Sequence, residues 1–450
     1  MSEDGRTRLK RWLESGEVSL QPLTFPQREL WESSPIPVAD PANHICAFIE
    51  VRGLLTAEDC YQAIQGVINR QEVMRLSILP GKDQPIQMIR SRGTPTMQYR
   101  QLSSASERRP EAVEDLMQEA FGEPFNLVQG PLYRVNVLRR DADDHLLVLT
   151  IHHAIADGWS LGAFVQDLGA AHLLRLAGRT EGLPPVQLSY SAWGATERAF
   201  WRSAEIDEHI PFWKSEMAGA QRLLTTPVDR HAMAMPLQRL VSHMPVSLGR
   251  AARDVARRHG VTLFSTLLTV FRIALSRWMD VNDVVVGTPV ANRSKQSVRE
   301  TMGYCSGIVP LRGQIEHDRP FSDNLRAVHQ TSVDCFAHAI PFVELMRSLG
   351  DRPTPGHTPF FDVRFALQNH PVPDVAVSGM AFKLKMRSTG TARFHLGCEI
   401  TEIGEALEVA WLFRPKLFPR EEINNLGSLF EALLAQVAHM PERRTAALTI

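Results

Sequence analysis

Hydrophobic and polar positions along the first part of the chain predict strands and helices that follow one another. The segments His44–Gly53, Pro131–Arg140 and His145–His153 carry apolar runs of strand length. The polar turn between the last two segments predicts a hairpin. Apolar residues at helical spacing predict helices over Thr56–Met74 and Ser160–Ala177, with Thr56 and Ser160 as their capping residues.

The second part of the chain continues this alternation. Val261–Met279 is apolar nearly all round, which predicts a buried helix, and Asp283–Arg293 predicts a buried strand that runs into a loop. A packing helix near the end is predicted by one apolar face: Ile423, Leu426, Phe430, Leu433 and Val437. Gly178–Ala192 combines Gly, a Pro pair and no helical period, which predicts a linker. We therefore expect a mixed α/β or α+β protein with lobes over residues 1–180 and 181–450.

Composition and charge are those of a globular protein with more than one core. Of the 450 residues, 44% are hydrophobic and 22% are charged. The formal net charge of -1 gives no global field that would recruit nucleic acid or an anionic membrane. The N-terminus lacks the apolar core of a signal peptide, and no window holds about 20 uninterrupted apolar residues. We therefore expect neither a nucleic acid partner nor a membrane.

Cysteine usage and short motifs exclude several other classes. The five cysteines are scattered, without the close pairs of a disulfide framework or a zinc knuckle. This pattern favours a reducing compartment, so we expect a cytoplasmic protein. The sequence also lacks the glycine-rich phosphate-binding motifs and the C-x-x-C motif. "GYCSG" (Gly303–Gly307) has the wrong spacing for a nucleophile elbow.

Two adjacent histidines stand at the end of an apolar run in "VLTIHHAIADGWSLG" (Val148–Gly162). Taken singly, His152, His153 and the pair Asp157-Gly158 fit an ordinary strand end and turn. Taken together, they put two imidazoles and a carboxylate on one short loop, and the spacing alone favours a functional site and a turn equally. Neighbouring side chains in a strand point to opposite faces, so we expect one histidine to face a substrate and the other to support the loop.

Metal binding competes with this interpretation, because two His and one Asp are acceptable zinc or iron ligands. Adjacent histidines diverge on a strand, and no third His or Glu follows at helical spacing. We therefore expect no metal at this loop. A buried Asp157 would instead need a cationic partner, which we expect to be an Arg from elsewhere in the chain.

Seven further segments carry recognisable patterns in a fixed order. They are "LTFPQRELW" (Leu23–Trp31), "NRQEVMRLSI" (Asn69–Ile78), "FNLVQGPLYRVNVLR" (Phe125–Arg139), "VVVGTPVANR" (Val284–Arg293), "MGYCSGIVPLR" (Met302–Arg312), "AIPFVEL" (Ala339–Leu345) and "PFFDVRFALQN" (Pro359–Asn369). With H-H-x-x-x-D-G, these segments resemble the motifs of the condensation domains of nonribosomal peptide synthetases, which have the chloramphenicol acetyltransferase-like fold. The resemblance covers nearly the whole chain. Two departures, Gln71 in place of the family's His and "CSGI" in place of F-V-N-T, bear on the acceptor more than on the fold.

The resemblance implies two acetyltransferase-like lobes in a V-shaped pseudo-dimer, with the H-H-x-x-x-D-G loop at their interface in a central tunnel. It implies an acyltransferase that joins a carrier-bound acyl thioester to an amine or hydroxyl, in nonribosomal peptide or hybrid polyketide biosynthesis. No bound cofactor is implied, because the substrates arrive on phosphopantetheine arms. The partners are carrier proteins and a small-molecule or carrier-bound acceptor. As given, the chain would be a monomeric free-standing enzyme or an excised domain.

The resemblance also assigns roles to individual residues. His153 contacts the nucleophile, while His152 supports the loop. Asp157 forms a structural ion pair with Arg293, the Arg of the A-N-R segment. Gly158 supplies backbone conformation or an N–H near the thioester oxygen. Arg75 braces the same loop, or else makes a surface salt bridge.

Three alternatives stay open at the level of sequence. A related acyltransferase of this fold would use a soluble acyl-CoA donor. A catalytically silent module would only bind carrier proteins. An epimerase-like relative, which shares H-H-x-x-x-D-G, would invert a carrier-bound aminoacyl group without forming a bond. The first 22 residues would form an edge helix and strand of the first lobe or help to dock a partner.

Overall fold

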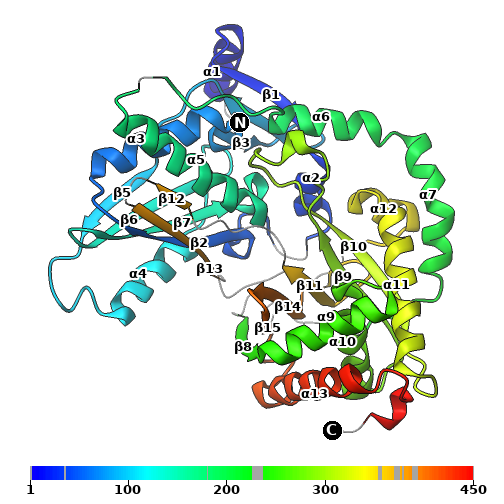
Figure 1. Cartoon of the computed structure of the whole chain (residues 1–450). Helices are drawn as coiled ribbons and strands as arrows, with labels where there is room; N and C mark the ends of the chain where they lie inside the picture. The colour runs from blue at the N-terminus through cyan, green and yellow to red at the C-terminus, as the bar shows by residue number, and fades with distance from the viewer. Residues whose placement is uncertain are drawn as a thin grey trace.

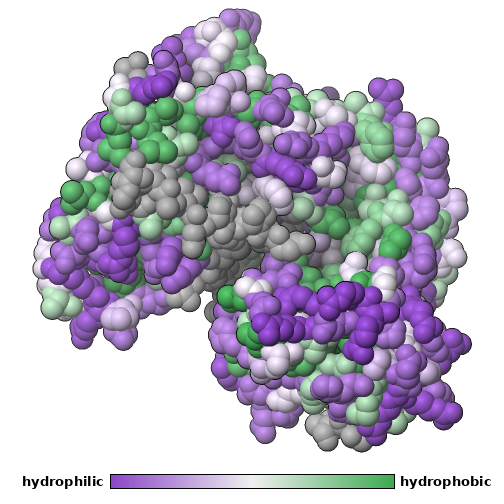
Figure 2. Space-filling view, in the orientation of Figure 1, coloured by the Kyte–Doolittle hydropathy of each residue, from purple (hydrophilic) through white to green (hydrophobic). Residues whose placement is uncertain are grey.

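The computed structural model describes residues 3–34, 37–179, 181–224, 237–352, 357–368, 375–377, 380–387 and 394–448. These residues form two lobes, each built on a six-stranded sheet (Figure 1). The mixed helix-and-sheet class predicted from the sequence is confirmed. In Figure 2 the surface is hollowed between the lobes, and the face in view carries both hydrophilic and hydrophobic residues.

The first lobe carries the histidine loop on one of its central strands. Its sheet runs in the order β12 (Val375–Val377), β13 (Met380–Arg387), β2 (His44–Arg52), β7 (Asp144–His152), β6 (Tyr133–Asp141) and β5 (Met97–Gln101). Its helices are α1 (Glu3–Glu14), α2 (Phe25–Glu32), α3 (Ala57–Arg70), α4 (Pro110–Gly122) and α5 (Gly158–Leu176). Helices α3 and α5 pack side by side, and α4 packs against β7. A small sheet adds β1 (Val18–Pro22), β4 (Ile86–Arg90) and β3 (Leu76–Leu79).

The predicted hairpin and the first predicted helix are present. β6 and β7 pair antiparallel, with Tyr133 opposite Ile151. Helix α3 begins after Thr56, whose hydroxyl accepts the N–H of Asp59 at 3.1 Å while the Asp59 carboxylate returns to the Thr56 N–H. This capping box gives acceptors to two backbone N–H groups at the start of the helix that would otherwise have none.

The second lobe has its own sheet and a layer of helices. The sheet runs β10 (Gly307–Gln314), β9 (Asp283–Val290), β11 (Val363–Gln368), β14 (Leu396–Ile403), β15 (Ala406–Phe413) and β8 (Gln238–Met244). The helices are α9 (Val246–His259), α10 (Leu263–Met279), α11 (Phe321–Ala337), α12 (Phe342–Leu349) and α13 (Arg420–His439). Helix α10 is buried along most of its length, as its nearly unbroken apolar sequence predicts. It packs between α9, α11 and α13.

The division at residue 180 does not separate the lobes completely. Residue 180 itself lies outside the described residues. The chain after it continues into α6 (Tyr190–Phe200) and α7 (Ser203–Glu216), which connect the lobes (Figure 1). However, β13 from the second half pairs antiparallel with β2, with Leu384 opposite Ile49. The first lobe therefore recruits two strands from residues 375–387. Sequence periodicity does not reveal this crossing, because a strand's pattern does not identify its partner.

Candidate active site

The histidine loop is a strand end, one short turn and a helix start. Strand β7 ends at His152, the 3-10 turn η3 covers His153–Ile155, and α5 begins at Gly158. The sequence predicted Ser160 as the cap of this helix, which is wrong. Asp157 is the capping residue, since its carboxylate accepts the Ser160 N–H at 3.0 Å. The Ser160 hydroxyl in turn accepts the Asp157 N–H at 3.2 Å, so the two side chains cap each other's backbone.

His152 is a buried side chain that holds the turn. Its Nδ1 accepts the Ala154 N–H at 3.0 Å, and its Nε2 lies 2.8 Å from the carbonyl oxygen of Val38. The ring packs edge-on against His44, whose pKa is lowered by burial. Both ring nitrogens of His152 thus contact backbone groups of the first lobe.

His153 is partly exposed and lies where the lobes meet. Its ring centroid is 4.2 Å from that of Tyr304, with the planes tilted by 57°. Tyr304 belongs to the segment that leads into β10 of the second lobe, and its hydroxyl donates to the buried Glu29 of α2 at 3.4 Å. The imidazole of His153 is therefore positioned by an aromatic side chain from the opposite lobe.

Asp157 and Arg293 form a buried ion pair across the lobes. Nη2 of Arg293 lies 3.1 and 3.2 Å from the two carboxylate oxygens of Asp157. The Arg293 side chain is 1% exposed and that of Asp157 is 4% exposed. The same carboxylate accepts the N–H groups of Cys305 and Ser306, each at 3.1 Å. The guanidinium also donates to three carbonyl oxygens of the second-lobe segment: Val298, Thr301 and Gly303.

The electrostatics of this pair follow from its burial. Burial alone would lower the pKa of Arg293, but the neighbouring Asp157 carboxylate raises it above its usual value. Burial also raises the pKa of the nearby Cys305 thiol. Cys305 is thus held as a neutral thiol, and it is its backbone N–H that serves the site.

Arg75 is not at the histidine loop. Its Nε donates to the carbonyl oxygen of Arg90 at 3.0 Å, and its Nη1 donates to that of Ile68 at 2.8 Å. These bonds tie the end of α3 to β4, so among the described contacts Arg75 neither braces the loop nor forms a surface salt bridge. A partly buried Arg is equally well satisfied by carbonyl oxygens, which the sequence does not distinguish from a carboxylate.

Gln27 makes the brace that was expected of Arg75. Its Nε2 donates to the carbonyl oxygen of Ala154, within the turn η3, at 2.9 Å, and its Oε1 accepts the Thr24 N–H at 3.0 Å. The side chain is fully buried. The only signal for it in the sequence is its place in "LTFPQRELW", which indicates family membership but not a contact.

Gln71, which departs from the family pattern, also bridges the lobes. Its Nε2 donates to Asp167 Oδ2 at 2.8 Å and to the Glu300 carbonyl oxygen at 2.9 Å, while its Oε1 accepts the Met302 N–H at 2.9 Å. The side chain is buried. Its NH₂ group donates two of these bonds and its carbonyl oxygen accepts the third, so both ends of the amide have partners. Gln71 therefore fixes the start of the segment whose later residues contact Asp157.

At Gly303, in the segment that contacts Asp157, an added side chain would clash with a buried ring. A Cβ added to it would lie 2.1 Å from the Tyr190 ring, which is fully buried. We expect Gly303→Ala to lower the free energy of unfolding by about 1 to 3 kcal/mol, because the ring has to move within a packed core. Urea denaturation measures the change. Gly122→Ala is the matched control, since nothing lies within 4 Å of the added atom, and equal stability of the two variants would contradict the expectation.

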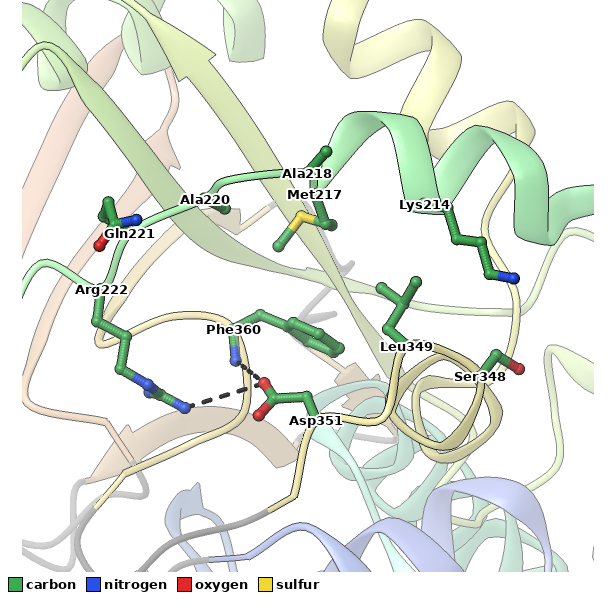
Figure 3. A pocket seen from close by; sticks show the side chains of 10 residues that line it. All are labelled: Lys214, Met217, Ala218, Ala220, Gln221, Arg222, Ser348, Leu349, Asp351 and Phe360. Carbon is green, nitrogen blue, oxygen red and sulfur yellow. Dashed lines mark hydrogen bonds and ion pairs between the residues drawn. The ribbon is translucent and has the colours of Figure 1, made fainter.

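Two cavities in the described part of the chain lie away from His153. One of about 460 Å³ lies between the end of α7 and the end of α12 in the second lobe, where Arg222, Asp351 and Phe360 line it (Figure 3). The other, of about 150 Å³, lies beside Arg70 and Asp167. Neither is lined by the histidines.

No single described helix is long and apolar enough to cross a membrane. Helices α9 and α10 reach the length and apolar composition of a membrane span only when taken together, and the chain bends by 107° between them.

Comparison with known proteins assigns the family. The sequence profile of the Condensation domain matches residues 19–450. The chain belongs to the condensation domain family. The family predicted from the motifs is confirmed.

The relatives of this condensation domain include a large synthetase and separately solved domains. The chain is 31% identical over 437 residues to phosphinothricin tripeptide synthetase PhsC of Streptomyces viridochromogenes, covering 95% of itself but 40% of that protein. The X-domain from teicoplanin biosynthesis superimposes with a TM-score of 0.83 at 19% identity, over 95% of this chain and 97% of that one. The starter condensation domain of rhizomide synthetase RzmA, solved as a mutant with C8-CoA, gives 0.80 at 18% identity over 95% and 97%. At these identities the solved structures show a shared fold.

Proposed function

We propose that this condensation domain transfers an acyl group from a carrier-bound thioester to an amine or hydroxyl acceptor, with His153 in contact with the attacking atom. The observation that carries the proposal is the division of roles within the loop. His152 and Asp157 are buried and committed to structural contacts, whereas His153 is partly exposed between the lobes. Of these three side chains, the imidazole of His153 is the one that is partly exposed, so we assign it to the substrate.

The proposed reaction exchanges one bond at the thioester carbonyl carbon and moves one proton. The acceptor nitrogen or oxygen attacks the thioester carbonyl carbon, giving a tetrahedral intermediate whose collapse breaks the carbon–sulfur bond. The acceptor's proton passes through the His153 imidazole to the departing sulfur, which leaves as the carrier's thiol. The product is an amide or an ester, and no redox partner is needed.

The demand on His153 depends on the acceptor. An α-amino group, with a pKa of about 7.7 to 8.0, is already partly neutral at pH 7. For an amine, holding the two reactants together supplies much of the acceleration, since positioning is worth roughly 7 to 11 kcal/mol. A hydroxyl is far less acidic, so His153 has to remove its proton as attack proceeds.

Three residues near His153 have roles of their own in this proposal. Gly158 is the first residue of α5, and N–H groups in a first helical turn lack an intrahelical acceptor. We assign its N–H to the developing negative charge on the thioester oxygen, which it would stabilise as an oxyanion hole does. Asp157 and Arg293 act as positioning residues, because both are buried and bonded to each other.

The proposed substrates need no cofactor bound to this chain. Donor and acceptor acyl groups would arrive on the phosphopantetheine arms of carrier proteins, with a free small molecule as the other form of acceptor. We propose that the chain acts as a monomer alongside these carriers. An acyl-CoA donor is the second candidate, favoured by the starter condensation domain of similar fold that was solved with C8-CoA.

The test is a product assay with purified protein. Acyl-carrier donors and, separately, the matching acyl-CoA donors are incubated with panels of amines and alcohols, and products are identified by mass spectrometry. New amide or ester from the carrier-bound donor, lost in His153→Ala, supports the proposal. Product from acyl-CoA alone supports the soluble donor, no product from any donor supports a silent carrier-binding module, and inversion of a carrier-bound aminoacyl group without bond formation supports an epimerase.

A further inference from the structure

Three buried titratable side chains lie close together in the second lobe, away from the histidine loop. Asp362 directly precedes β11 and His395 directly precedes β14. These strands are parallel neighbours, with Val363 opposite Leu396, so Asp362 and His395 are adjacent and bonded through the His395 N–H and the Asp362 carbonyl oxygen at 3.1 Å. His357 comes from the segment before β11. The three residues are between 1% and 7% exposed.

The ligand atoms of these side chains lie close to one another. Nδ1 of His357 lies 3.1 Å from Oδ1 of Asp362, and Nε2 of His395 lies 4.0 Å from the same oxygen. All three atoms lie within 4.8 Å of one another. Ligands around a tetrahedral zinc ion, with bonds of about 2.0 to 2.2 Å, are separated by about 3.3 Å. The two measured separations bracket that value.

The surroundings orient the carboxylate. Its second oxygen, Oδ2, accepts the N–H of Leu224 at 3.0 Å, which leaves Oδ1 facing both imidazoles. Such a bond to a ligating carboxylate is the usual outer support of a metal site. The 3.1 Å contact of His357 has the length of a hydrogen bond, and the 4.0 Å contact of His395 is longer. One carboxylate oxygen facing two ring nitrogens is an arrangement in which all three atoms can bind one ion.

Arg222 limits how much negative charge the cluster carries. Its Nη1 lies 3.6 Å from Asp362 Oδ1, and its Nη2 lies 3.9 Å from Asp351 Oδ2. Figure 3 shows Arg222 reaching toward Asp351 at the rim of the cavity. The guanidinium is thus shared between two carboxylates, and the charge of Asp362 is only partly balanced by it.

We propose that His357, Asp362 and His395 bind a zinc ion that fastens the segment before β11 to the start of β14. Imidazole nitrogen with one carboxylate oxygen is a ligand set that zinc accepts. A water molecule completes the four-coordinate shell. Since the ligands are buried and come from three separate positions of the chain, the ion stabilises the fold of the second lobe.

The test is zinc binding by the whole chain after treatment with a chelator. Calorimetric titration is expected to give one equivalent of zinc for the wild type, and Co²⁺ in its place is expected to give the absorption bands of a tetrahedral site. His357→Asn and His395→Asn should each weaken binding at least about tenfold, since losing even an outer partner costs that much. His243→Asn is the matched control: His243 lies 3.8 Å from Glu408 but is exposed, and its loss should leave the affinity unchanged.

Circular dichroism shows whether the ligand variants fold. If one does not, a variant outside the ligand set still tests the proposal. Arg222→Gln removes the competing cation and should tighten zinc binding several-fold while raising the zinc-dependent increase in Tm. Failure of the wild type to take up zinc would overturn the proposal. So would equal affinity in His395→Asn and the wild type, or an affinity unchanged by Arg222→Gln.

Discussion

Asp157→Asn is expected to lower the free energy of unfolding by about 3 to 5 kcal/mol, the usual cost of leaving one member of a buried ion pair without its partner. The amide offers one acceptor oxygen in place of two. The N–H groups of Cys305 and Ser306 and the guanidinium of Arg293 would then compete for it, and the amide NH₂ would face donors. Because these donors belong to the second lobe, the loss includes the junction between lobes. Urea denaturation followed by tryptophan fluorescence measures it.

The control for this variant is a carboxylate in an exposed ion pair. Asp254 pairs with Arg257 on the surface of α9, and Asp254→Asn should leave stability nearly unchanged, as exposed pairs contribute little. In Asp157→Asn/Arg293→Gln neither member of the pair is charged, so part of the loss should be recovered. A stable Asp157→Asn protein that had lost only its activity would contradict this account and would make Asp157 a chemical participant.

His153→Ala is expected to reduce turnover with a hydroxyl acceptor by about 10² to 10⁴-fold, the contribution usual for a general base. With an amine acceptor of the same skeleton the reduction should be smaller, since the nucleophile is already partly deprotonated. The comparison distinguishes two effects of the substitution. Loss of proton removal should slow the hydroxyl reaction more than the amine reaction, whereas the cavity left by the missing ring should slow both reactions equally. Rates are measured with a carrier-bound donor by mass spectrometry of the products.

His152→Ala is the complementary variant. It removes the contacts with Ala154 and Val38, so we expect lower stability, by about 1 to 3 kcal/mol for the buried groups left unsatisfied. The free energy of unfolding of His153→Ala should equal that of the wild type, because the His153 ring is partly exposed. In the rate assay with His153→Ala, equal losses of rate for the amine and the hydroxyl acceptor would rule out a proton-transfer role of His153.

Local patterns predicted the secondary structure well, and contacts between distant segments poorly. The hairpin of β6 and β7 and the buried helix α10 follow from apolar period and turn residues. The strands β12 and β13 escape such reasoning, because their pairing with β2 joins residues far apart in the chain. The start of α5 was misplaced because both Asp157 and Ser160 are good capping residues, and only the backbone decides between them.

The same limit applies to the site. The residues of the histidine loop stand together in the sequence, so the loop was found from it. Its braces are side chains and backbone N–H groups from other segments. Gln27, Gln71 and the N–H of Cys305 carry no chemical signature that marks them in advance. The motif predicts Arg75 at the loop, but its N–H groups donate to the carbonyl oxygens of Arg90 and Ile68.

The crossing of β12 and β13 into the first lobe has a consequence for making hybrid proteins. A chimaera joined in the linker, with one parent supplying everything before it, would inherit its β2 and β13 from different parents. Their antiparallel register, from Arg52 with Ala381 to Cys46 with Arg387, would then have to form between strands that never evolved together. If the fit failed, β2 would become an open sheet edge and a template for aggregation. Exchanges between relatives therefore have to carry residues 375–387 together with the first lobe.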